Sequence, residues 1–166
     1  MSRLAMIAFG ATCLTAVAGC NQSAPNVPQS EGAAGPHVLA ATDIEAGRYI
    51  VATSGCNDCH TPMYARTNGA QPPESEWLKG SPEPHKGPWG TSYGKNLRLT
   101  VASLTEDEWV ELLSSGSSLP PMPWPSVRNM SEPDKRALYR YIKSLPGDPG
   151  QPAPASMPAG PSSKAG

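Results

Sequence analysis

The sequence predicts an all-α domain with long loops, and three observations carry that prediction. Three segments open with a helix-capping pattern, in which a hydroxyl side chain stands three residues before a carboxylate. Behind each cap, apolar residues recur at the spacing of one helix face. No stretch alternates apolar and polar residues over a useful strand length, so no extensive sheet is expected.

The first helix is expected to begin after Thr42, because "TDIE" at residues 42–45 matches the capping box. Side chains that share one helix face recur at intervals of three and four residues. The predicted inner face of this helix consists of Ile44, Gly47, Ile50 and Val51.

A second capping box, "TEDE" at residues 105–108, predicts a helix that ends at Gly116 and has Trp109, Leu112 and Leu113 on its apolar face. The third start, "SEPD" at residues 131–134, is a weaker version with Asp. Pro133 is tolerated there because amides of the first turn lack helical partners. The apolar face of this last helix consists of Ala137, Leu138, Tyr141, Ile142 and Leu145, before Pro146 and Gly147 stop it.

Residues 1–19 combine a basic start with an apolar run, which predicts a secretory signal peptide rather than a spanning helix. The run leads into "VAGC" at residues 17–20, which resembles the lipobox of bacterial lipoproteins. In that family cleavage precedes the cysteine, here Cys20, and the new terminus and the thiol are acylated. The resemblance implies a lipid anchor on the periplasmic or outer face of a bacterial membrane. Asn21 resembles the signal of lipoproteins forwarded to an outer membrane. An ordinary signal peptide that happens to end beside a cysteine is the alternative.

Three further segments follow from composition. Residues 20–40 are small, polar and proline-bearing, which predicts a flexible tether behind the lipidated cysteine. Residues 41–146 are sufficient for one compact domain. Residues 147–166, rich in Pro, Ala and Gly, are predicted to be a disordered tail. The formal net charge of the chain is −1, and without a basic stripe no nucleic-acid partner is expected.

The segment between Pro62 and Val101 is rich in Pro and Gly and shows no helical pattern. Structureless loops of this length are uncommon in a small domain. Three short helices with few large apolar side chains are also marginal by themselves. A bulky apolar cofactor is therefore expected to fill the middle of the domain.

The stretch "SGCNDCHTP" at residues 54–62 places Cys56, Cys59 and His60 on one face if it is helical. This spacing is the signature of covalent haem c attachment, in which both thiols bond the porphyrin and the imidazole binds iron. A zinc site would need a fourth ligand. A thioredoxin-like pair would need a βαβ context, and a plain disulfide would leave the loops unexplained. Haem attachment is favoured, and the three alternatives stay open at this point.

A haem iron in an electron carrier needs a second axial ligand, and methionine opposite histidine raises the potential. The candidates beyond the signal peptide are Met63, Met122, Met130 and Met157. Met122 is preferred because "SLPPMPWPS" surrounds it with stiffening prolines. Met130 is expected to pack on the last helix. His37 and His85 are the weaker rivals.

Three polar or aromatic residues in "GPWGTSYGKN", residues 87–96, remain without an assigned role: Trp89, Tyr93 and Asn96. Side chains of these types can line a haem edge or hydrogen-bond its propionates, and they serve equally well as packing within the loop. The sequence does not decide between the two roles.

Taken together, "EAGRYIVATSGCNDCHTP", "LTEDEWVELLSSG" and "LPPMPWPSVRNMSEPDKRALYRYIKSLP" resemble the class I c-type cytochromes of the small bacterial monohaem type. The resemblance implies a cytochrome c fold, in which helices and long loops wrap around one haem and the terminal helices cross at Gly47. By position, it implies that Cys56 and Cys59 carry the haem and that His60 and Met122 are the proximal and distal ligands. The stretch "NLRLTVASLTEDE" departs from the family because it is abbreviated and lacks a proline.

The resemblance implies an electron carrier rather than an enzyme, with no small-molecule substrate. Expected partners are redox proteins: a dehydrogenase or quinol-oxidising complex as donor, and a terminal oxidase or reductase as acceptor. One alternative is a haem gas sensor or peroxidase-like protein with an open distal iron site. Another is a surface lipoprotein without haem.

Overall fold

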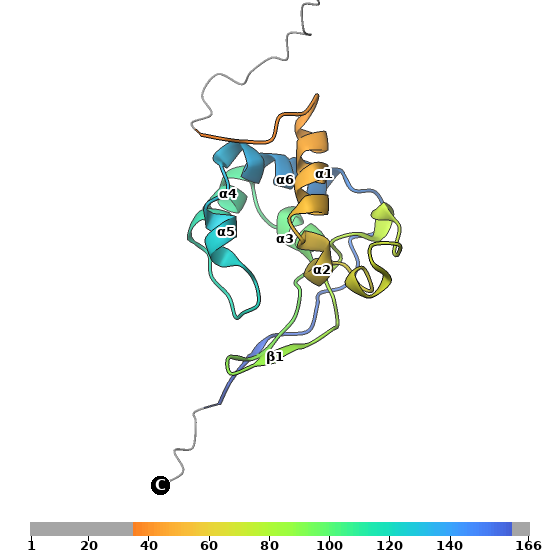
Figure 1. Cartoon of the computed structure of the whole chain (residues 1–166), viewed down its shortest axis with the longest axis vertical. Helices are drawn as coiled ribbons and strands as arrows, with labels where there is room; N and C mark the ends of the chain where they lie inside the picture. Colours follow the sequence, from red (N-terminus) through yellow and green to blue (C-terminus); the bar gives the residue numbers. More distant parts are fainter. Residues whose placement is uncertain (1–34, 161–166) are drawn as a thin grey trace, which may run out of the picture.

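The structure, a computed structural model, describes residues 35–160 of the chain (Figure 1). The predicted signal peptide, Cys20, most of the predicted tether and residues 161–166 lie outside the described residues. None of the helices within residues 35–160 has both the length and the apolar character needed to span a membrane.

The described chain is mostly helical, as predicted, but it also contains three short strands. The helices are α1 (Asp43–Thr53), α2 (Cys56–His60), α3 (Leu97–Ala102), α4 (Glu106–Ser115), α5 (Trp124–Arg128) and α6 (Glu132–Ser144). Two 3-10 turns, η1 (Ala65–Thr67) and η2 (Glu74–Glu76), lie in the long loop. The strands β1 (His85–Gly87), β2 (Gly90–Ser92) and β3 (Met157–Pro158) form one antiparallel sheet in that order. Strands of two or three residues are too short to show an alternating pattern in the sequence.

All three predicted helix starts are confirmed by their caps. The Thr42 hydroxyl accepts a hydrogen bond from the amide of Glu45 at 3.2 Å, and Ser131 caps α6 in the same way. At α4 the capping box is complete, because the Glu108 carboxylate also accepts from the Thr105 amide at 2.7 Å. These starts were predictable because a cap is a contact between residues three apart.

Helices α1 and α6 cross in direct contact at Gly47 (Figure 1). Around the crossing, Ile50, Val51 and several α6 side chains are buried, together with Trp109 and Leu113 of α4. The predicted inner face of α1 needs one correction, because Ile44 is 46% exposed and Ala46 is buried in its place. Ile44 lies in the first turn of the helix, and the buried residues of α1 begin only at Ala46.

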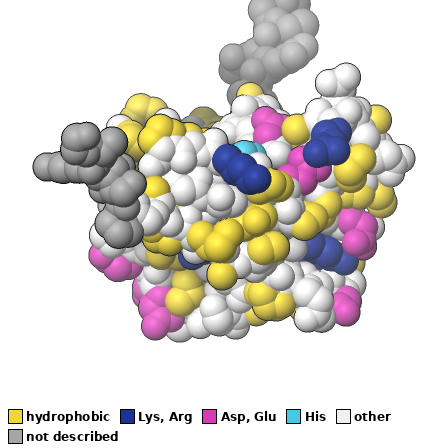
Figure 2. All heavy atoms as spheres, turned by 90° about the horizontal axis from the view of Figure 1, so that it is seen from below, with side chains coloured by type: hydrophobic (Ala, Val, Ile, Leu, Met, Phe, Trp, Pro, Cys, Tyr) yellow, Lys and Arg dark blue, Asp and Glu magenta, His cyan; other side chains and the backbone are white. Residues whose placement is uncertain are grey.

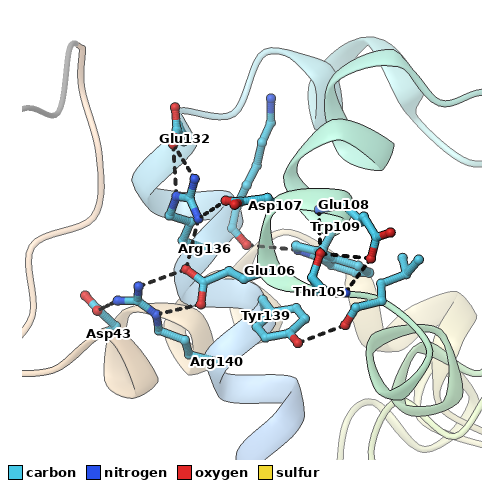
Figure 3. A network of polar contacts seen from close by, with 12 residues as sticks. Asp43, Thr105, Glu106, Asp107, Glu108, Trp109, Glu132, Arg136, Tyr139 and Arg140 are labelled. Carbon is cyan, nitrogen blue, oxygen red and sulfur yellow. Dashed lines mark hydrogen bonds and ion pairs between the residues drawn. The ribbon is translucent and has the colours of Figure 1, made fainter.

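An ion-pair network ties the same helices together (Figure 3). Both Arg136 and Arg140 of α6 bind the Glu106 carboxylate at the start of α4, at 3.2 and 2.8 Å. Arg140 also pairs with Asp43 at the start of α1. Burial opposes the charge on Glu106, but the hydrogen bonds from Arg140 and Arg136 outweigh it and lower the pKa of this carboxyl. The network therefore joins three helices that are distant in sequence.

The long loop supplies part of its own core. Leu78 is fully buried, and Trp77 joins the hydrophobic cluster formed by the helices. The buried guanidinium of Arg98 donates to the carbonyls of Trp77 at 2.7 Å and Ser75 at 2.8 Å, and to the carbonyl of Pro146. These backbone contacts hold the loop and the end of the domain together, although its composition predicted little structure.

The structure differs from the predicted disordered tail over residues 147–160. Strand β3 pairs with β2, so that Met157 lies opposite Thr91, and the amide of Ala159 donates to the Trp89 carbonyl at 2.9 Å. These contacts use backbone amides and carbonyls, which every residue except proline offers in full. Composition therefore gave no signal for them.

Candidate functional site

The three residues of the C-x-x-C-H motif lie on one short helix, α2. Gly55, with a positive φ of 72°, turns the chain from α1 into α2. The helical spacing places Cys56, Cys59 and His60 on one side of the helix. Both cysteines are free and half-buried, so they form no disulfide. The predicted helical geometry of the motif is therefore what the structure shows.

The thiols of α2 differ from those of a redox-active pair. Burial raises the pKa of Cys56 to about 11, and burial also raises the pKa of Cys59. Redox-active dithiols need a lowered thiol pKa, because the thiolate is the nucleophile. The shifts of both thiol pKa values are therefore opposite to those of a redox-active pair.

His60 is buried, with 7% of its surface exposed, and its ring is fixed by one hydrogen bond. Its Nδ1 lies 2.7 Å from the carbonyl oxygen of Lys95. A carbonyl only accepts, so Nδ1 carries the proton and Nε2 keeps its lone pair. Burial lowers the pKa of His60, and the bond to Lys95 offsets this only in part, so the imidazole is neutral near pH 7. A neutral ring oriented through its second nitrogen is the state that a metal ligand requires.

A backbone cradle from the long loop holds α2 in place. A Cβ on Gly94 would lie 1.7 Å from the carbonyl oxygen of Cys59, so the two backbones touch at this point. The amide of Gly80 donates to the His60 carbonyl at 2.8 Å, and the amide of Ser81 donates to the Gly94 carbonyl at 2.9 Å. Glycine at position 94 thus lets the loop approach closely enough for the next carbonyl, that of Lys95, to reach the imidazole. Sequence reasoning missed this role, and the Gly-rich composition of residues 87–96 was the available signal.

Met122 comes from a separate part of the fold, the loop that joins α4 to α5 (Figure 1). It is half-buried, and its carbonyl accepts a hydrogen bond from the Trp124 amide at 2.8 Å. Met130 packs against the core, as predicted, and Met63 is about half exposed. Met157, which was expected in a disordered tail, lies in β3 and is also about half exposed. The axial role of Met122 stays a prediction.

The three unassigned loop residues, Trp89, Tyr93 and Asn96, differ in their hydrogen bonds. Asn96 uses its whole amide within the fold, because Oδ1 accepts from the Leu99 amide and Nδ2 donates to two tail carbonyls. It is the N-cap of α3, and both of its N–H donors are already used within the fold. Trp89 differs, because its indole Nε1 is buried with no hydrogen-bond partner. Unpartnered buried donors are rare in folded proteins. The backbone amide of Tyr93 donates to the Ser156 hydroxyl at 3.3 Å.

The chain is 29% identical over 109 residues to the cytochrome c subunit of a quinone alcohol dehydrogenase from Gluconacetobacter polyoxogenes. The same subunit of Komagataeibacter europaeus matches equally well. The similarity is to c-type cytochromes. It covers 60% of this chain but only 21% of each relative, so the chain spans about a fifth of the length of the curated relatives it matches. No protein-family model and no solved structure matches the chain.

The donor set of α2 fits a haem c. It offers two free thiols three residues apart and a neutral imidazole whose Nε2 is available. The unpartnered Nε1–H of Trp89 lies on a separate element, the turn between β1 and β2. Residues 35–160 contain no group of three or more His, Cys, Asp or Glu side chains arranged to hold a metal ion.

Hydrophobic side chains gather on the end of the molecule that is seen in Figure 2. They form a band across this face, with a histidine and basic side chains at its border, whereas acidic side chains lie mainly toward the margins. This is the end of the fold at which the β1–β2 hairpin lies (Figure 1).

Proposed function

We propose that residues 41–146 form a monohaem c-type cytochrome with the cytochrome c fold, and that its function is to carry single electrons. The observation that carries the proposal is the arrangement of α2, in which two free thiols accompany an imidazole held by the Lys95 carbonyl. The weak similarity to cytochrome c subunits supports the same reading. When bound, the haem supplies an iron that changes between Fe(II) and Fe(III) and so holds or releases one electron.

Each residue has a distinct part in this proposal. Cys56 and Cys59 hold the porphyrin through thioether bonds, and His60 offers Nε2 to the iron. Met122 would offer its sulfur as the further protein ligand of the iron, and this neutral, soft atom would favour the reduced state. Trp89 offers its free Nε1–H to a carboxylate of the haem edge.

The two proposed iron ligands explain why the protein would transfer electrons rather than transform a substrate. With His60 and Met122 both bound to the iron, no position would be left for a substrate or gas, and the gain or loss of an electron would need little rearrangement of the protein. The chain is therefore proposed to act as a carrier and not as an enzyme. The carbonyl of Lys95 holds the His60 ring at 2.7 Å, which restricts ring rotation.

The relatives, which are named as cytochrome c subunits of quinone alcohol dehydrogenases, support a dehydrogenase as one partner. We propose a dehydrogenase or a quinol-oxidising complex as electron donor, and a terminal oxidase or reductase as acceptor. The hydrophobic band of Figure 2 is a suitable contact area for such a partner. The signal peptide and lipidated Cys20 would keep the protein on the periplasmic or outer face of a bacterial membrane, and Asn21 favours the outer membrane.

The test uses the full chain, produced in a bacterial host with a cytochrome c maturation system. Pyridine haemochrome analysis is expected to show one covalently bound haem per chain. The oxidised protein should display the weak far-red charge-transfer band of sulfur-ligated ferric haem, and the reduced protein should not bind CO at once. Met122→Ala should abolish the band, whereas Met63→Ala, at an exposed methionine, should preserve it.

Two outcomes would overturn parts of the proposal. A colourless but natively folded protein would show that no haem is attached, as in a lipoprotein without a cofactor. A haem protein that lacks the far-red band and binds CO immediately would instead have the open distal site of a gas sensor or peroxidase-like protein.

A further inference from the structure

Lys135 is a buried lysine whose ammonium group binds two segments at once. Only 5% of the residue is exposed, although it lies in the first turns of α6. Its Nζ donates to the Ser114 hydroxyl at 2.9 Å and to the Arg128 carbonyl at 3.0 Å. Ser114 lies in the last turn of α4, and Arg128 is the last residue of α5. The two partners therefore flank the loop that carries Met122.

Further contacts close this loop at its base. The guanidinium of Arg128 donates to the Gly116 carbonyl at 3.1 Å, and the indole of Trp124 donates to the Ser118 hydroxyl at 2.7 Å. Near the tip, the Ser92 hydroxyl of β2 donates to the Pro120 carbonyl. The segment from Gly116 to Arg128 is consequently fixed at both ends, and Lys135 is the side chain that links both ends to α6.

Burial of the Lys135 ammonium group is unfavourable unless hydrogen bonds compensate for the lost hydration. A buried ammonium group loses its hydration and is normally compensated by a carboxylate. None of the ion pairs formed within residues 35–160 includes Lys135. Its compensation comes instead from a hydroxyl and a carbonyl, and a carbonyl at the end of a helix attracts a cation. An apolar side chain would fill the space but would not connect α4 and α5.

We propose that Lys135 is a positioning residue for the distal iron ligand. By holding α4 and α5 against α6, it restrains the loop between them and so limits how often Met122 leaves the iron. This inference rests on the proposed function, in particular on Met122 as an axial ligand. A thioether is a weak, neutral ligand, so the rate at which it leaves depends on the freedom of the loop that carries it.

The test measures how fast imidazole binds to the oxidised haem-bearing protein, because imidazole enters only when Met122 has left. Lys135→Met keeps the volume but removes all three donors. Its imidazole association rate is expected to rise by at least about tenfold, because both hydrogen bonds of the charged group are lost. The far-red band should also disappear at a lower temperature than in the unmodified protein.

Tyr139→Phe is the matched control. Tyr139 lies one turn further along α6 and is equally buried, but its hydroxyl donates to the Leu104 carbonyl at 2.9 Å and not to the Met122 loop. Its loss should lower global stability and leave the imidazole rate unchanged. Ser114→Ala removes one Nζ partner and should raise the rate by a smaller factor, which tests the inference even if Lys135→Met fails to fold.

The failure of each proposal has its own signature. If Met122→Ala retains the far-red band, Met122 is not the ligand and the proposed function fails at that residue. If Met122→Ala loses the band but neither Lys135→Met nor Ser114→Ala raises the imidazole rate, the ligand assignment stands and the positioning role of Lys135 is overturned.

Discussion

A Cβ placed on Gly47 would lie 2.2 Å from the carbonyl oxygen of Ala137. Real Cβ atoms do not approach a carbonyl so closely. Only glycine at position 47 therefore permits the backbones of α1 and α6 to cross in direct contact. The resemblance to c-type cytochromes implied a crossing at Gly47, and the contact gives that implication a physical reason. The crossing holds the first and last helices of the domain together. Because α2 follows α1 directly through Gly55, the crossing also helps to fix the position of α2.

Gly47→Ala is expected to destabilise the protein by about 1–3 kcal/mol, because the added methyl must push α6 away. The sign is informative, since alanine in place of glycine normally stabilises a helix by about 1 kcal/mol. Thermal or denaturant unfolding of the haem-bearing protein measures the change. Ala52→Gly, at an exposed position of α1, is the control for helix propensity alone. A stabilised Gly47→Ala protein would contradict the close crossing.

Stability is expected to fall at acid pH through Glu106. Its pKa is lowered in the folded state by Arg140 and Arg136, against the opposing effect of burial. A carboxyl with a lowered folded pKa contributes stability above its unfolded pKa and loses it as the pH falls through the folded value. The loss should therefore begin as the pH falls to the ordinary range of a glutamate carboxyl and continue below it, toward the lowered pKa of the folded state. Because the Arg140 side chain is 46% exposed, solvent limits the effect to about 1 kcal/mol.

Glu106→Gln tests this pH dependence. The variant should be less stable than the unmodified protein at pH 7, and its stability should change less between pH 6 and the acid range. Glu111→Gln, at an exposed position of α4 outside the network, should leave the pH profile unchanged. Chemical unfolding at a series of pH values, at low salt, measures both. Parallel profiles for the unmodified and Glu106→Gln proteins would show that the network does not act through this carboxylate.

Gly94→Ala is expected to disturb His60 without touching it directly. The new methyl would meet the Cys59 carbonyl, so the loop must withdraw and take the Lys95 carbonyl away from Nδ1. A hydrogen bond at Nδ1 makes the imidazole a stronger donor to a metal. Its loss disfavours Fe(III), so the reduction potential of the haem-bearing protein should rise by tens of millivolts, on the order of one hydrogen bond.

A redox titration measures this potential. Gly160→Ala serves as the control, since nothing lies within 4 Å of a Cβ placed there. A potential that stays constant in Gly94→Ala, with normal haem content, would mean that the Lys95 carbonyl follows the imidazole or has no influence on the iron.

The features that the sequence predicted are mostly local. The caps at Thr42, Thr105 and Ser131 join residues three apart, and the face of α2 follows from helical spacing. The inner face of α1 was predicted less well, since the period of the apolar residues does not show which turns of the helix are covered by other parts of the fold. Ile44 fits the period but is exposed, because it lies in the first turn of α1, ahead of the residues that are buried.

The features that the sequence did not predict depend on contacts between distant residues. The carbonyl that orients His60 comes from Lys95, and any residue could supply a carbonyl at that position. The two segments that Lys135 links likewise offer a hydroxyl and a carbonyl with no characteristic pattern. The path of residues 147–160 is the clearest case, because a segment rich in Pro, Ala and Gly has no apolar periodicity to reveal a partner.

The Asn96 side chain holds the segment of residues 147–160 against the loop. The Asn96 amide nitrogen donates to the Pro149 carbonyl at 2.7 Å and to the Gln151 carbonyl at 3.1 Å, while its oxygen caps α3. Asn96→Asp preserves the cap, because a carboxylate also accepts from the Leu99 amide. It removes both donors and places negative charge against two carbonyl oxygens. The tail should therefore detach from the loop without the loss of α3.

Amide hydrogen exchange of Ala159 reports this detachment, because its N–H donates to the Trp89 carbonyl at 2.9 Å when β3 is in place. In Asn96→Asp its exchange is expected to accelerate by about tenfold, as one or two hydrogen bonds no longer oppose local opening. Asn68→Asp introduces the same charge at an exposed position and should leave the rate unchanged. If exchange stays slow in Asn96→Asp, the pairing of β3 with β2 is sufficient to hold the tail, and Asn96 acts only as the cap of α3.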